Sequence, residues 1–212
     1  MSNKRSFFEP NSNGNHILYE ERDAIEKISL NLLSYIPINC SQTIVIACIG
    51  TDRSTGDSLG PLVGTFLSEK ANFPFFVYGT LDDPIHAVNL KEKLTEIKEK
   101  YGEERKSEIT FIIAVDACLG RMKNVGTVQI ADGPLKPGAG VNKQLPEIGD
   151  IHITGIVNIS GFMEFFVLQN TRLNLVLKMA RTIADSIHMA GQSLPTKKSL
   201  PPISWNFKEE AT

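Results

Sequence analysis

Two aspartates follow apolar runs that are typical of buried strands, and carboxyl groups in such places can do acid–base chemistry. Asp57 lies in a polar, glycine-bounded loop after the apolar run 43–49, and Asp116 ends a second run, 109–116. Because the carboxyl ends of neighbouring parallel strands border one crevice, we expect both side chains to face it. Two carboxyl groups there could share a proton, activate a water molecule or hold a cation.

Each aspartate also has a structural interpretation. Asp57 precedes a predicted helix, whose first N–H groups its carboxylate can cap. Asp52, Thr55 and Ser58 suit that role equally, so the helix does not depend on one residue. Asp116 follows apolar residues, where an unpaired charge is costly, so its alternative is a hydrogen bond to a loop. If both face one crevice, a shared proton raises the pKa of one and leaves the other charged, which separates an acid from a base.

The elements that must position these residues follow from hydrophobic periodicity. Apolar residues at helical spacing alternate with short β-branched runs, which predicts a three-layer α/β/α domain around a largely parallel mixed sheet. We expect helices at 19–36, from Pro61, at 87–101, and from a cap at Asn170 to a stop at Gly191, and strands at 43–49, 74–80, 109–116, 126–130 and 151–157.

The remaining segments set the domain boundaries. Residues 1–18 are predicted to form a flexible arm, 19–192 a single domain and 193–212 a polar tail. The third and fourth strands are close enough in sequence to form an antiparallel, hairpin-like pair. Residues 131–149 hold four glycines and three prolines and are predicted to be an irregular loop, of a length that is often functional.

Composition restricts the class of protein. The chain has 212 residues, 42% of them hydrophobic and 22% charged, which is enough for one full core. The net charge of -2 provides no basic field for nucleic acid, and the apolar runs are too short to cross a bilayer. Three unpatterned cysteines (Cys40, Cys48 and Cys118) favour reduced, buried thiols in a cytosolic protein.

Other catalytic chemistries have weaker support. The sequence lacks the Gly-x-Ser-x-Gly elbow, the phosphate-binding loop and the dinucleotide-binding glycine pattern. Cys118 lies close enough to Asp116 to be a nucleophile candidate, but a buried thiol without a chemical role is the stronger interpretation. His86 is the one histidine that we consider as a ligand. The neighbouring Asp82 and Asp83 favour turn formation over metal binding.

The residues around both aspartates resemble a known family. Residues 55–61 (TGDSLGP) and 114–117 (AVDA) resemble two segments of the germination protease of spore-forming bacteria, each of which carries a catalytic aspartate. Residues 128–133 (VQIADG) and 137–141 (PGAGV) are similar to that family's next strand and glycine-rich loop. The chain as a whole resembles the short sporulation proteins of the YyaC type, described as candidate spore proteases. The wider group includes the endopeptidases that mature nickel hydrogenases and has a phosphorylase/hydrolase-like fold.

The resemblance implies that Asp57 and Asp116 are a catalytic pair that cleaves a peptide bond. It places Thr55, Ser58, Gly138 and Gly140 beside the substrate, where the glycine-rich loop would offer backbone N–H groups to the developing oxyanion. The expected substrate is a small spore or sporulation protein in the cytoplasm of the forespore or in the spore interior. No metal, cofactor, nucleic acid or membrane is expected, and the sequence leaves open whether the chain forms a homo-oligomer.

Two rival functions remain at this point. The first is a non-catalytic sporulation protein that binds a partner peptide in the same crevice, because a fold does not fix a function. The second is a metal-dependent hydrolase of the hydrogenase-endopeptidase type. Those enzymes bind metal with two carboxylates and a histidine, but residues 138–144 contain no histidine. A chelator should inactivate the second rival and leave a carboxylate peptidase unaffected.

Overall fold

The structure is a computed structural model, and it describes residues 16–37, 43–101, 110–137 and 145–194. Within these residues one six-stranded sheet has the strand order β1-β5-β6-β4-β2-β3. The strands are β1 (Ile17–Leu18), β2 (Thr43–Cys48), β3 (Phe76–Tyr78), β4 (Thr110–Gly120), β5 (Thr127–Asp132) and β6 (Ile151–Ile159). The helices are α1 (Ala24–Tyr35), α2 (Leu59–Ser68), α3 (Leu90–Tyr101), α4 (Glu164–Gln169) and α5 (Leu173–Ser193), with short 3-10 turns η1 (Gly56–Ser58) and η3 (Met122–Asn124).

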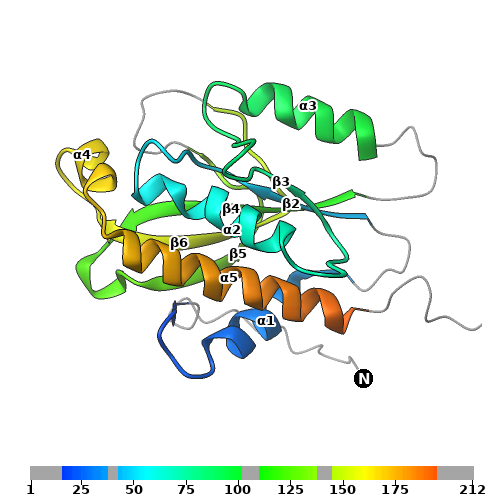
Figure 1. Ribbon diagram of the computed structural model, residues 1–212, viewed down its shortest axis with the longest axis horizontal. Helices are drawn as coiled ribbons and strands as arrows, with labels where there is room; N and C mark the ends of the chain where they lie inside the picture. Colours follow the sequence, from blue (N-terminus) through cyan, green and yellow to red (C-terminus); the bar gives the residue numbers. More distant parts are fainter. Residues whose placement is uncertain (1–15, 38–42, 102–109, 138–144, 195–212) are drawn as a thin grey trace, which may run out of the picture.

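Helices cover both faces of the sheet, which confirms the predicted three-layer α/β/α architecture (Figure 1). The apolar faces of α1, α2 and α5 pack with one sheet face around Ile46, Ile113 and Ile153. On the other face, Leu90 and Leu94 of α3 join a smaller core. Burial of these apolar faces away from water is the main term that stabilises such a domain.

The sheet is largely parallel, as predicted, but one pairing differs from the prediction. β3, β2, β4 and β6 run parallel, and β5 and β1 add antiparallel pairs at one edge. The expected hairpin of the third and fourth strands is wrong, because β6 lies between β4 and β5. Ile153, Ile156 and Val157 of β6 are all buried, and a strand buried on both faces favours the interior of a sheet.

Other ends of helices and strands also differ from the predicted ones, and the packing explains the differences. Residues 17 and 18, expected in the flexible arm, pair with β5 as β1. Asn170 does not cap the last helix. It lies at the end of α4, which was not predicted, and its side-chain amide donates to the Phe166 carbonyl at 2.8 Å. Gly191 does not stop α5, which runs on to Ser193. A Cβ at Gly191 would lie 2.9 Å from Pro74, so this glycine allows close packing.

The predicted loop 131–149 is shorter and more ordered at its ends than expected. β5 continues to Asp132, and Leu135 and Ile148 form an antiparallel bridge. Within the described part of the chain, no helix is both long and apolar enough to cross a membrane.

The chain leaves the two central strands, β2 and β4, toward opposite sides of the sheet. From β2 the chain continues to β3 on one side of the sheet, whereas from β4 it continues to β5 and β6 on the other side. The carboxyl ends of neighbouring strands that diverge in this way border the crevice in which open α/β sheets bind ligands. This position lies beside both predicted site residues.

Candidate active site

Asp116 lies within β4, and the prediction that it ends the strand is wrong. β2 pairs with β4 only as far as Cys48 opposite Val115, whereas β6 accompanies β4 up to Gly120. Asp116 is therefore the first residue of β4 beyond the end of β2. Pairing with β6 keeps the Asp116 backbone in a strand, while the other side of β4 at this residue faces the loop that follows β2.

The loop after β2 folds back on itself and places Asp57 near this opening. Gly50 N donates to the Ile85 carbonyl at 2.8 Å, and Thr51 N donates to the Asp57 carbonyl at 3.1 Å. Gly50 has φ +144°, and a Cβ there would lie 1.9 Å from the Asp57 carbonyl oxygen. Only glycine permits both this backbone conformation and so close an approach. Gly50 therefore fixes the position of the Asp57 backbone.

Asp57 forms part of η1, which lies against β4 and α4. A Cβ at Gly56 would lie 2.7 Å from Leu168 of α4, so the turn also sits tightly on that helix. Neither η1 nor α2 has a side-chain hydrogen bond at its N-cap. The capping interpretation of Asp57 is therefore wrong, and its carboxyl group is left for other chemistry.

Two opposing effects act on the pKa of Asp57. The side chain is half-buried, and burial raises its pKa above the ordinary value. The hydroxyl of Ser54, in the same turn, opposes that rise in pKa, although it makes no hydrogen bond of normal geometry with the described residues. Asp57 thus remains the more readily ionised member of the pair.

The pKa of Asp116 is raised much further than that of Asp57. Burial raises its pKa to about 8, and the negative charge of Asp57 adds to the rise. The N–H of Ala117 donates to Asp116 Oδ1 at 2.8 Å, which opposes the rise, as a donor to the charged form must. The residue as a whole is half-buried. A protonated Asp116 beside a charged Asp57 is the separation of acid and base expected for such a pair.

Thr154 and Cys118 complete the surroundings of Asp116. Thr154 of β6 lies opposite Asp116 in the sheet register, and its side chain opposes the rise in the pKa of Cys118. Burial, together with the charge of Asp116, raises the pKa of Cys118 to about 11. The thiol therefore stays protonated near neutral pH, which disfavours its role as a nucleophile.

The other predicted residues have different outcomes. Ser58 Oγ donates to the Thr55 carbonyl at 2.7 Å, so its hydroxyl holds the turn together. Gly138 and Gly140 lie outside the described residues, as does Cys40. The structure brings Asp57 and Asp116 together and adds Ser54 and Thr154, which the sequence analysis missed. Only the register of β4 against β6 makes Thr154 a neighbour of Asp116.

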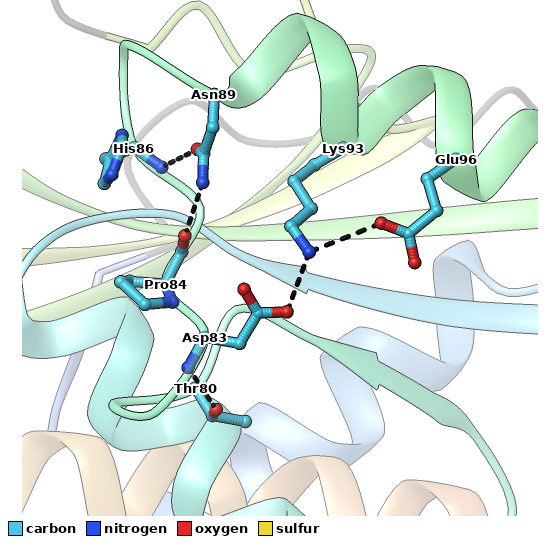
Figure 2. Close-up of polar contacts among 7 residues, drawn as sticks. All are labelled: Thr80, Asp83, Pro84, His86, Asn89, Lys93 and Glu96. Atoms are coloured by element: carbon cyan, nitrogen blue, oxygen red, sulfur yellow. Dashed lines mark hydrogen bonds and ion pairs between the residues drawn. The ribbon is translucent and has the colours of Figure 1, made fainter.

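His86 and Asp83 are engaged in local structure at the start of α3 (Figure 2). The backbone N–H of His86 donates to Asn89 Oδ1 at 2.8 Å. Asp83 N donates to Thr80 Oγ1 at 3.2 Å, and the Asp83 carboxylate binds Lys93 at 2.8 Å. These contacts confirm the turn interpretation of Asp83. Within the residues that the structure describes, no three His, Cys, Asp or Glu side chains form a group that could hold a metal ion.

A solved structure shares this fold. The chain is similar to the structure of the NiFe hydrogenase maturation protease HycI from Thermococcus kodakarensis KOD1, with a TM-score of 0.52, 18% sequence identity, and coverage of 76% of this chain and 99% of that chain. At this identity the similarity shows the fold alone. It agrees with the fold expected from the sequence.

Sequence comparison places the chain in a family. A family model described as "Protein of unknown function (DUF1256)" matches residues 16–186, and the chain belongs to this family. It is 52% identical over 188 residues to "Uncharacterized protein YyaC" of Bacillus subtilis (strain 168), with 89% of each chain covered. The resemblance to YyaC-type proteins is thereby confirmed.

Proposed function

We propose that the chain is an endopeptidase in which Asp57 is the general base and Asp116 the general acid. The observation that carries the proposal is the unequal environment of the two carboxyl groups: the pKa of Asp116 is raised to about 8, partly by the charge of Asp57. Near neutral pH this gives one carboxylate and one carboxylic acid at the same end of the sheet. The peptidase-like fold shared with HycI supports the same class of reaction.

The proposed reaction proceeds through a gem-diol. The Asp57 carboxylate removes a proton from water while the water oxygen attacks the peptide carbonyl carbon, and Asp116 donates its proton to the carbonyl oxygen. Asp57 then delivers its proton to the amide nitrogen, the C–N bond breaks, and a gem-diol hydroxyl returns a proton to Asp116. The products are a carboxylic acid and an amine, and both aspartates recover their starting protonation states.

The proposed substrate is a small spore or sporulation protein, cleaved in the cytoplasm of the forespore or in the spore interior. Support for this finer assignment comes from the sequence similarity of residues 55–61 and 114–117 to the germination protease. A protein substrate also suits a site that lies at a sheet end and stays open to solvent.

Cleavage of a panel of small spore proteins by wild type, Asp57→Asn and Asp116→Asn tests the proposal, with Asp52→Asn as the control. Asp52 lies exposed in the same loop as Asp57. We expect wild type and Asp52→Asn to cleave, and both site variants to lose at least about a hundredfold in rate, as for loss of general acid–base catalysis. Equal cleavage by all four folded proteins would refute the assigned roles. Loss of cleavage with a chelator, reversed by one divalent metal, would favour the metal-dependent rival.

A further inference from the structure

The residues around the start of α4 form an apolar patch on the surface of the protein. This α4 patch consists of Ile159, Phe162, Met163, Phe165 and Phe166, each of which is at least 40% exposed. α4 itself has no buried residue, and it projects from one end of the molecule (Figure 1). Monomeric proteins rarely expose large apolar patches, and such patches mark sites of interaction.

Contacts on the inner side of α4 hold the patch in place. Asn158 Nδ2 donates to the Val167 carbonyl at 3.3 Å, and Leu168 lies against Gly56 of η1. Met163, just before the helix, has φ +57°, a strained backbone conformation for a bulky side chain. Strain of this kind persists only where the surrounding structure enforces it, and it is concentrated at functional sites. The fold therefore keeps these apolar residues exposed in one fixed arrangement.

The charges in and around the patch restrict the class of partner. Within residues 151–173 the only acidic or basic side chains of Asp, Glu, Lys or Arg type are Glu164 and Arg172. Glu164 Oε1 accepts from Gly161 N at 3.2 Å, so this carboxylate is engaged in its own turn. Surfaces that bind nucleic acid or lie on a membrane are rich in lysine and arginine, which disfavours both partners. An apolar surface with so little charge can pair with a copy of itself without bringing like charges together.

The exposed area fits one side of a dimer interface. Phe162, Phe165 and Phe166 are 90%, 57% and 52% exposed. Since a fully covered aromatic side chain buries about 150–250 Å², these three rings alone offer roughly 400 Å² of apolar surface. Ile159, Met163 and the polar residues that border the patch add to this, and a standard interface buries about 800 Å² per partner. Two-fold homodimers, in which one patch contacts its own copy, are the commonest oligomers.

We propose that the α4 patch is the interface of a homodimer, in which the phenylalanine rings of one copy pack against those of the second copy across a two-fold axis. The rings of Phe165 and Phe166 already meet edge to face, with centroids 6.0 Å apart, and a second copy extends this arrangement with further aromatic pairs. The inference does not depend on the peptidase function. Because the inner side of α4 packs on η1, the dimer places its interface close to the turn that carries Asp57 in each copy.

Sedimentation velocity of the full-length protein at increasing concentration tests the proposal. The variants are Phe162→Glu and Phe165→Glu, with Val88→Glu as the control, because Val88 is 86% exposed and lies outside the patch. We expect wild type and the control to dimerise as concentration rises. The dimer dissociation constant of each phenylalanine variant should be at least about thirtyfold higher, as for loss of a central aromatic contact. A wild type that stays monomeric, or a dimer that survives both substitutions, would overturn the proposal. The monomeric result would assign the patch to a different protein partner.

A second measurement needs no substitution, so it covers the case in which a variant does not fold. Met163 lies in the patch and is 51% exposed, whereas Met189 lies toward the far end of α5 and is 43% exposed. In wild type labelled with 13C at the methionine methyl groups, we expect the Met163 resonance to shift with protein concentration and the Met189 resonance to stay in place. A Met163 resonance that does not move while the protein dimerises would place the interface elsewhere and contradict the proposal.

Discussion

Asp57 and Asp116 are electrostatically coupled across the end of β2, and the charge of Asp57 adds to the rise in the pKa of Asp116. Asp116 lies just beyond the last residue of β4 that pairs with β2, and Asp57 lies in the turn that closes over that end. The two carboxyl groups therefore ionise in a fixed order: Asp57 ionises first, and Asp116 keeps its proton to a higher pH.

The first prediction concerns the pH dependence of stability. The folded chain holds a proton on Asp116 up to about pH 8, whereas the unfolded chain releases it near the ordinary value of 3.8. Between these values the folded state binds more protons, so this contribution to stability is lost as pH rises. For one such group the loss is up to about 1.4 kcal/mol per pH unit.

Urea unfolding of wild type and Asp116→Asn at pH 5, 6 and 7 checks this prediction. The free energy of unfolding of wild type should fall relative to that of Asp116→Asn at each step, because asparagine does not titrate. The exposed Asp52→Asn variant should follow wild type. Parallel pH dependences for wild type and Asp116→Asn would contradict the raised pKa.

The second prediction concerns Gly50. Gly50 and Gly161 have nearly the same φ, +144° and +146°, but only at Gly50 would a Cβ meet other atoms, beginning with the Asp57 carbonyl. Alanine at Gly161 should cost about 1–3 kcal/mol in unfolding free energy for the backbone conformation alone. Alanine at Gly50 should cost more, because it also displaces Asp57. Urea unfolding measures both, and equal losses would show that the contact with Asp57 does not matter.

The third prediction concerns Cys118. Because its pKa is raised to about 11, little thiolate is present at pH 7.5. Alkylation of Cys118 by iodoacetamide should be at least about a hundredfold slower in the folded protein than in urea. Mass spectrometry of the Cys118 peptide gives both rates. Rapid alkylation in the folded protein would restore the thiol as a nucleophile candidate.

Local patterns in the sequence were sufficient to predict the layers of the fold and to draw attention to two aspartates near one end of the sheet. β2 and β4 are apolar runs with β-branched residues, and each leads to a carboxyl group at one end of the sheet. The pairing of strands could not be predicted in the same way, since nothing near β4 or β5 indicates that β6 lies between them. That arrangement depends on contacts between residues distant in the sequence.

The same limit applies to the candidate site. Asp57 looked like a helix cap because the residues after it form a helix, but no side chain caps the turn or the helix in the structure. Ser54 and Thr154 carry no motif of their own. Ser54 becomes notable because its buried hydroxyl has no hydrogen-bond partner among the described residues, and Thr154 because the register places it opposite Asp116.

The most direct test of the acid–base pair is a 13C NMR titration of the Asp116 carboxyl carbon in wild type and in Asp57→Asn. We expect a midpoint of about 8 in wild type. In Asp57→Asn the midpoint should be lower, because the neighbouring charge is gone, yet still above the ordinary value, because burial is the larger cause. An Asp116 midpoint near the ordinary 3.8 in wild type would contradict the assignment of Asp116 as the acid.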